Sequence, residues 1–268
     1  MNYTASHIKF VFLLLTGFIL ASCEKVIDIN INNVNKKYVI EGTITDNLNS
    51  CRVSLSQTLD ITDSNQFKGV KGAIITIQED NKTPLQLKDN GEGIYGANIA
   101  GKPGHRYTLL VKIGNDHFSA TSVMPQKVKF DSLFVTERMF LGKMRKIATV
   151  AFKDPPGKGN AYRFTQLTDG KKENSIFIFD DNLIDGRPVI NELLIFGDDE
   201  RSLKKGDQLT VEMRCIEMPV YLYWYSLTQG ALGQNQSASP ANPVSNITGG
   251  AIGYFSANTF EAKTMTVK

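Results

Sequence analysis

The stretch Arg106-Tyr107-Thr108-Leu109-Leu110-Val111-Lys112-Ile113 decides the fold class of this chain. Side chains alternate between the two faces of a strand, so one apolar face is shared by Tyr107, Leu109, Val111 and Ile113. Gly114-Asn115-Asp116 has the composition of a hairpin turn and leads into a second predicted strand over 117–123. The sequence therefore predicts an antiparallel hairpin with one buried face.

The same pattern extends toward the N-terminus. Further strands are predicted at 38–45, 51–56 and 73–78, and turn residues gather at 46–49, 89–93 and 101–104. Short strands at regular spacing are typical of a β-sandwich. We therefore expect an immunoglobulin-like β-sandwich over 37–125.

After Pro125 the chain continues with β-type patterning. Strands are predicted at 129–136, 146–153, 161–167, 175–179, 189–196, 208–216 and 260–267. The best helix candidate is 217–229, where Pro219 suits the first turn and Gly230 can cap the end. We expect a mainly β protein of two β-sandwich-like domains, 37–125 and 126–268, with one short helix in the second.

The N-terminus has the layout of a lipoprotein signal peptide over 1–22. The apolar run 10–20 would span only about half of a ~30 Å hydrocarbon core. Leu20-Ala21-Ser22-Cys23 matches a lipobox, which predicts lipidation of Cys23 and membrane attachment through it. An ordinary secretory signal with a chance cysteine is the alternative.

Residues 23–36 are expected to form a tether. Because Glu24 rather than an aspartate follows the predicted lipidated cysteine, outer membrane is the favoured location. Whether the body faces the periplasm or the cell surface stays open, as does the oligomeric state.

The composition argues against one class of function, and the cysteine positions indicate the state of the thiols. A net charge of +3 without long basic runs argues against nucleic-acid binding. Cys51 and Cys215 keep the parity of apolar strand neighbours, so buried free thiols are favoured over a disulfide.

The densest aromatic group gives the candidate binding residues Tyr221, Tyr223, Trp224 and Tyr225. Such side chains stack on sugars or anchor partners. The alternative is that half of them pack the helix on a sheet. Gly-rich residues 242–255 are interpreted as a close-packed loop capping the second sandwich, or as a partner-facing loop.

No catalytic or cofactor site is predicted. Asp180, Asp181 and Asp185 lack the spacing of a Ca²⁺ loop and favour a solvated turn. His105 and His117 have no clustered third ligand, so zinc is not expected. No Gly-x-Ser-x-Gly motif occurs, and a hydrolase with a spatially formed acid pair remains an alternative.

Two resemblances follow from short motifs. The first set is Glu41–Asp46, 69–73, Asp89-Asn90-Gly91 with Ile94-Tyr95, and Gly101–Gly104 with Tyr107. It resembles the carboxypeptidase-regulatory or transthyretin-like sandwich, which implies a fold and no chemistry.

The second set is Cys23–Ile29, Glu41-Gly42, Phe179–Asp181 with Asp185-Gly186, Asn242–Ile247 and Gly249–Phe255. It is similar to the domain-of-unknown-function family 4249 of Bacteroidota lipoproteins over nearly the whole chain. The resemblance implies an accessory lipoprotein often encoded beside TonB-dependent transporters, with no catalytic residues to carry over. We therefore expect a non-enzymatic accessory protein for ligand capture or complex assembly. A surface glycan-binding or adhesion module is the alternative.

Overall fold

The computed structural model describes residues 36–59, 68–140, 142–195, 202–230 and 242–268. The predicted signal peptide, Cys23 and all but residue 36 of the tether lie outside the described residues. Residues 36–268 belong to one compact unit. The expected fold class is confirmed, because this unit is mainly β and contains one short helix.

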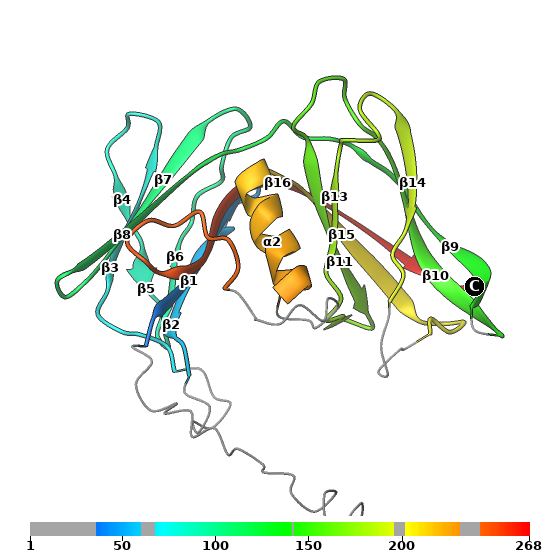
Figure 1. Ribbon diagram of the computed structural model, residues 1–268, viewed down its shortest axis with the longest axis horizontal. Coiled ribbons are helices and arrows are strands. Elements are labelled where there is room, and N and C mark those ends of the chain that lie inside the picture. Colours follow the sequence, from blue (N-terminus) through cyan, green and yellow to red (C-terminus); the bar gives the residue numbers. More distant parts are fainter. Residues whose placement is uncertain (1–35, 60–67, 141, 196–201, 231–241) are drawn as a thin grey trace, which may run out of the picture. The chain divides into compact units, whose positions relative to one another are not determined.

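The largest sheet has nine strands in the order β12-β11-β15-β16-β1-β2-β6-β5, with β13 also paired to β11. These strands are β1 (Tyr38–Thr45), β2 (Cys51–Gln57), β5 (Lys88–Asp89), β6 (Ile94–Ala97), β11 (Ala161–Thr168), β12 (Lys171–Lys172), β13 (Phe177–Asp180), β15 (Gln208–Ile216) and β16 (Ile252–Thr266). The sheet thus joins strands from both halves of the sequence (Figure 1).

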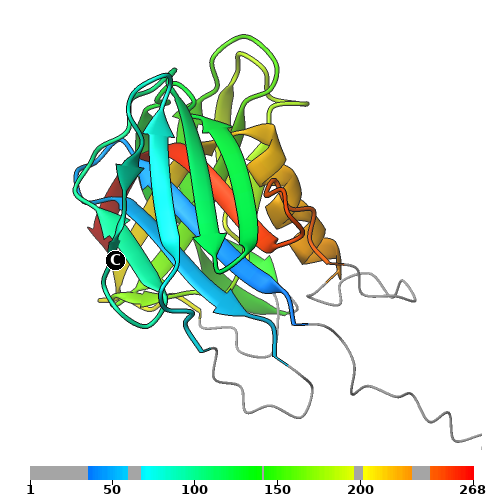
Figure 2. The same ribbon diagram turned by 90° about the vertical axis from the view of Figure 1, so that its left-hand side faces the viewer.

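Two smaller sheets pack against it. One has the order β4-β3-β7-β8, formed by β3 (Ile74–Glu79), β4 (Leu85–Gln86), β7 (Arg106–Ile113) and β8 (Asp116–Val123). Figure 2 shows these strands crossing in front of β1 and β2. The other has the order β14-β10-β9, formed by β9 (Phe130–Phe140), β10 (Lys143–Lys153) and β14 (Pro188–Glu192).

The predicted helix is confirmed as α2 (Met218–Gly230). Val220 is buried on its inner side, and Pro219 occupies the first turn, where its missing N–H costs no hydrogen bond. Within the described part of the chain, no helix has the length and apolar character needed to cross a membrane.

Strand β16 corrects one expectation. Gly253 does not belong to a loop capping the second sandwich, because β16 begins at Ile252 and pairs in parallel with β1. Farther along, β16 pairs antiparallel with β15. A Cβ on Gly253 would lie 2.0 Å from the carbonyl oxygen of Ile40, so the close backbone approach expected of these glycines is real but serves a strand pair.

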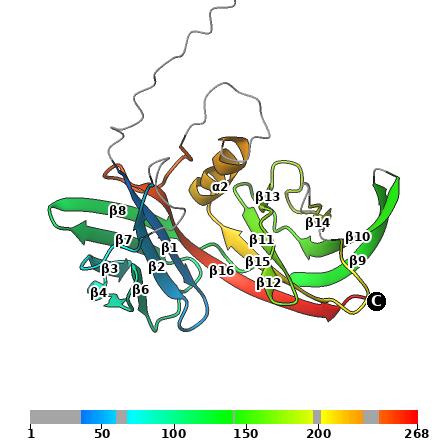
Figure 3. The same ribbon diagram turned by 90° about the horizontal axis from the view of Figure 1, so that it is seen from below.

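One face of the nine-stranded sheet is buried in two separate hydrophobic clusters. Ile40 and Phe255 pack with Leu109 of β7 in the first, and Tyr162 packs with Phe152 of β10 in the second. The opposite face carries a third cluster, in which residues of β11 and β15 meet α2 (Figure 3). Strand β16 contributes residues to both large clusters, so the clusters do not divide the chain at one position. The domain boundary expected between residues 125 and 126 stays a prediction.

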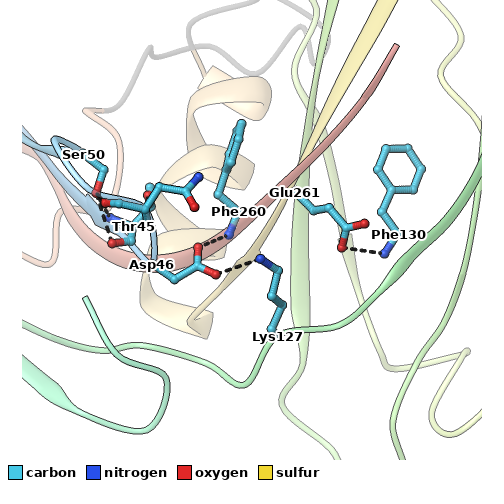
Figure 4. Close-up of polar contacts among 8 residues, drawn as sticks. Thr45, Asp46, Ser50, Lys127, Phe130, Phe260 and Glu261 are labelled. Atoms are coloured by element: carbon cyan, nitrogen blue, oxygen red, sulfur yellow. Dashed lines mark hydrogen bonds and ion pairs between the residues drawn. The ribbon is translucent and has the colours of Figure 1, made fainter. Parts of the chain in front are cut away.

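Two carboxylates form hydrogen bonds close to Asn258, where the pairing of β16 with β1 ends. Asp46 accepts hydrogen bonds from the backbone N–H of Phe260 at 2.8 Å and from the ammonium group of Lys127 at 2.9 Å (Figure 4). Glu261 accepts one from the backbone N–H of Phe130 at 3.1 Å. The segment that connects the two halves is therefore bound to the strand they share.

Candidate functional site

Helix α2 divides the predicted aromatic group between its two sides. Tyr223 and Trp224 are buried, whereas Tyr225 is 46 % exposed and Tyr221 is half-buried. Residues 221 and 225 are one helical turn apart, and their rings stack with centroids 5.9 Å apart and planes 16° apart. The four residues therefore do not form one surface.

Tyr221 and Tyr225 line a groove of about 580 Å³ between α2 and strands β13 and β14, which we call the aromatic groove. Its other walls combine apolar side chains with polar ones: Asn174, Ser175, Ile176, Phe177, Ile178, Phe179, Glu192, Leu194 and Thr228. Burial and then the neighbouring Asp180 raise the pKa of Tyr221, so its hydroxyl is neutral and can donate. Stacked rings beside hydrogen-bonding groups suit a ligand with an apolar face and polar edges.

Trp224 lies on the other side of the helix. The guanidinium group of Arg163 stacks over its ring at 3.7 Å from the centroid. Both residues line a second cavity of about 170 Å³, which we call the charged pocket and define by Arg163, Lys172, Glu212, Arg214, Trp224 and Asn258. Sequence reasoning missed its strand residues.

The acidic turn is bound to the loop that connects β10 to β11. The Asp181 carboxylate is buried and accepts a hydrogen bond from the N–H of Asn160 at 2.9 Å. Asp185 accepts one from the N–H of Gly157 at 2.8 Å, and Asp180 one from the side chain of Asn182 at 2.6 Å. Asp181 and Asp185 therefore bind the turn to the preceding loop, and Asp181 is buried rather than solvated as expected.

His105 belongs to an ion-pair cluster at one end of β3 and β7. Its Nδ1 lies 2.6 Å from a carboxylate oxygen of Asp80 and 3.3 Å from one of Glu79. Glu79 also pairs with Lys82 at 2.8 Å. The backbone N–H of Arg106, followed by His105, lowers the pKa of Asp80. The expectation that His105 has no clustered ligand partners is therefore wrong, because ligand atoms of Glu79, Asp80 and His105 all lie within 4.8 Å of one another.

His117 lies elsewhere, with its Nδ1 2.9 Å from the carbonyl oxygen of Asn115. Among the described residues, neither His105 nor His117 forms a hydrogen bond with a serine or cysteine side chain.

The two described cysteines are free thiols, as expected. Cys51 is buried in the first hydrophobic cluster and Cys215 in the second. Burial raises the pKa of Cys51 to about 12 and also raises that of Cys215. Both thiols are therefore protonated at neutral pH and poorly nucleophilic.

Comparison with known proteins assigns the chain to a family. No curated protein matches the chain. A model of the family described as Domain of unknown function matches residues 24–264, which include every residue of both cavities. The chain therefore belongs to the family Domain of unknown function (DUF4249).

Proposed function

We propose that this chain is a lipid-anchored outer-membrane protein that captures a ligand as an accessory to a TonB-dependent transporter. In this proposal, residues 1–22 are the signal peptide of a Bacteroidota lipoprotein, and acyl chains on Cys23 hold the protein in the membrane. The lipobox supports the anchor because it predicts lipidation of Cys23. Several acyl chains bind a bilayer far more firmly than one.

The aromatic groove carries the binding part of the proposal. Stacked tyrosines lose little side-chain entropy on binding and present a large apolar contact area. The groove's volume of about 580 Å³ lies within the range of small-molecule sites, and its walls hold a few fixed polar groups. Binding followed by transfer to a transporter requires no catalytic group.

Co-purification tests the transporter partner. The lipidated protein, carrying an affinity tag at its C-terminus, is recovered from detergent-solubilised outer membranes, and its partners are identified by mass spectrometry. We expect a TonB-dependent transporter in stoichiometric amount, and we expect its loss with Cys23→Ala, which leaves the body unanchored. Repeated recovery of the lipidated protein without a transporter would contradict the proposal.

The stacked pair Tyr221 and Tyr225 also favours a second candidate function, a surface glycan-binding module. Sugar rings present an apolar face to aromatic side chains and hydroxyls to polar neighbours. Glu192 lines the aromatic groove, and its Oε1 accepts a hydrogen bond from the Nε–H of Arg138 at 2.6 Å. The same carboxylate could accept hydrogen bonds from sugar hydroxyls.

A glycan panel distinguishes the two functions. The glycan-binding module predicts a hit whose affinity falls at least tenfold with Tyr225→Ala. Leu222→Ala is the matched control, because Leu222 is on the same helix, is similarly exposed and does not line the aromatic groove. A panel without saturable binding, or an equal loss in both variants, excludes the glycan-binding module.

A further inference from the structure

The charged pocket holds more positive than negative charge. Arg163, Lys172 and Arg214 supply cations, whereas Glu212 supplies the carboxylate and pairs with Arg214 at 2.7 Å. Among the residues that the structure describes, no carboxylate lies within ion-pair distance of Arg163 or Lys172. Glu41 on β1 acts on both cations from farther away.

These cations repel one another, and partial burial adds a desolvation cost for Arg163 and Lys172. Burial is the main cause that lowers the pKa of Arg163, and repulsion by Arg214 contributes, while Tyr254, Glu212 and Glu41 oppose the change. Burial likewise lowers the pKa of Lys172, and both arginines lower it further. A bound anion would remove this repulsion.

The charged pocket also contains two hydrogen-bonding groups that have no partner within the described part of the chain. No described residue offers an acceptor to the buried Nε–H of Arg163 or a donor to the buried Oδ1 of Asn258. The Asn258 side chain is itself only 1 % exposed, and its amide nitrogen donates to Thr43 and Ser256. Unpaired buried groups destabilise a fold, so a native structure that keeps them calls for an explanation.

We propose that the charged pocket binds a small oxyanion, a carboxylate or a phosphate ester, that also carries a hydroxyl group. The oxyanion accepts from Arg163 and Lys172, and the hydroxyl donates to Asn258. Trp224 covers one face of the Arg163 guanidinium and leaves its N–H edge for a planar or tetrahedral anion. This site lies beyond the aromatic groove and does not depend on a transporter partner.

The volume sets the size of the ligand. A cavity of about 150 Å³ accommodates benzene, so about 170 Å³ accommodates a compact anion of sugar-acid size, with part of it in solvent. Lys172 is exposed, which places one cation of the pocket at the surface. Glucuronate and glucose 6-phosphate are suitable probes of the two oxyanion types, and glucose is the neutral match.

Trp224 is the only tryptophan of the chain and lines the charged pocket, so tryptophan fluorescence can report binding there. The full-length chain, purified in detergent, is titrated with each probe and with inorganic phosphate. We expect a saturable change with at least one hydroxylated anion and none with glucose. Affinity should fall as pH rises through the lowered pKa of Lys172, because its protonated amine is the binding form.

Two neighbouring lysines provide the matched pair of variants. Calorimetry should show at least fivefold weaker anion binding for Lys172→Gln and less than twofold for Lys171→Gln, which does not line the charged pocket. Arg163→Gln should weaken binding at least tenfold. The absence of saturable anion binding, or equal effects of the two lysine variants, would overturn the proposal and leave the stack of Arg163 on Trp224 as a packing contact.

Discussion

Asp154 is a fully buried carboxylate that the fold accommodates by hydrogen bonding. It accepts from the hydroxyl of Tyr162 and from the backbone N–H of Gly186 at 3.0 Å. Burial raises the pKa of Tyr162, and the bond to Asp154 adds to this, so the phenol stays protonated as the donor. The pair joins strand β11 to the turn that follows β10.

Tyr162→Phe should lower the free energy of unfolding by about 1–3 kcal/mol, because Asp154 keeps its burial and loses a donor. Urea denaturation measures the change. Tyr225→Phe, at an exposed position, is the control and should change stability by less than about 0.5 kcal/mol. Equal effects of the two variants would mean that the buried hydrogen bond contributes nothing.

Ionisation of the Cys51 thiol should make the free energy of unfolding vary with pH in the alkaline range. Its pKa in the folded chain is about 12, raised by burial above the ordinary value of 9.0. The unfolded chain ionises first, so the stability conferred by the neutral thiol is complete below pH 9 and declines as pH rises toward 12. The urea midpoint of the natural chain should therefore fall more steeply above pH 9 than that of Cys51→Ala. Parallel curves would contradict this assignment.

The residues of the charged pocket show the limit of sequence reasoning at this scale. Arg163 and Thr165 alternate with buried Tyr162 and Phe164, which identifies a polar strand face. Nothing in the sequence shows that α2 covers that face and encloses Arg163 beside Trp224. By contrast, the burial of Cys51 followed from strand parity alone.

Among the long strands, β16 was predicted least well. Its last seven residues, 260–266, were expected as a strand, but the strand begins at Ile252. The glycines that made 242–255 look like a loop permit a parallel pairing with β1, about 200 residues away, and no local pattern encodes a partner so distant. Strand β7 and helix α2 were predicted closely because local alternation and helix-end residues define them.

Gly253→Ala tests the parallel pair. Its φ is +115°, and an added Cβ would meet the Ile40 carbonyl at 2.0 Å, so we expect destabilisation of about 3 kcal/mol or loss of folding. Gly250→Ala is the matched control, since its φ of +87° is also left-handed but the space around it is open. Gly250→Ala should lower the free energy of unfolding by only about 1–2 kcal/mol, the cost of placing an alanine in a left-handed backbone conformation. Similar losses in both would show that φ alone matters and that the close approach does not.

At the scale of the whole molecule, the shared strand should couple the two halves during unfolding. Asp46 holds β16 and the connecting segment together through Phe260 and Lys127. We predict one cooperative transition, with coincident midpoints for Trp224 fluorescence and far-ultraviolet circular dichroism.

Asp46→Ala should lower stability by about 1–3 kcal/mol, because the Phe260 N–H loses its acceptor. Asp131→Ala removes a surface ion pair with Lys129 at 3.6 Å and should change stability by less than about 1 kcal/mol. Separate midpoints for the two probes in the natural chain would show that the halves unfold independently.

The central claim is that a membrane-anchored binding protein presents the aromatic groove to a transporter, and site-specific photocrosslinking in intact cells tests it most directly. A photoreactive phenylalanine replaces Tyr225 in the groove or, as control, Leu183, which is 87 % exposed and outside both cavities. We predict a crosslink from position 225 to a TonB-dependent transporter that is lost with Cys23→Ala and absent from position 183. No transporter crosslink at position 225, or equal crosslinks at both positions, would contradict the claim.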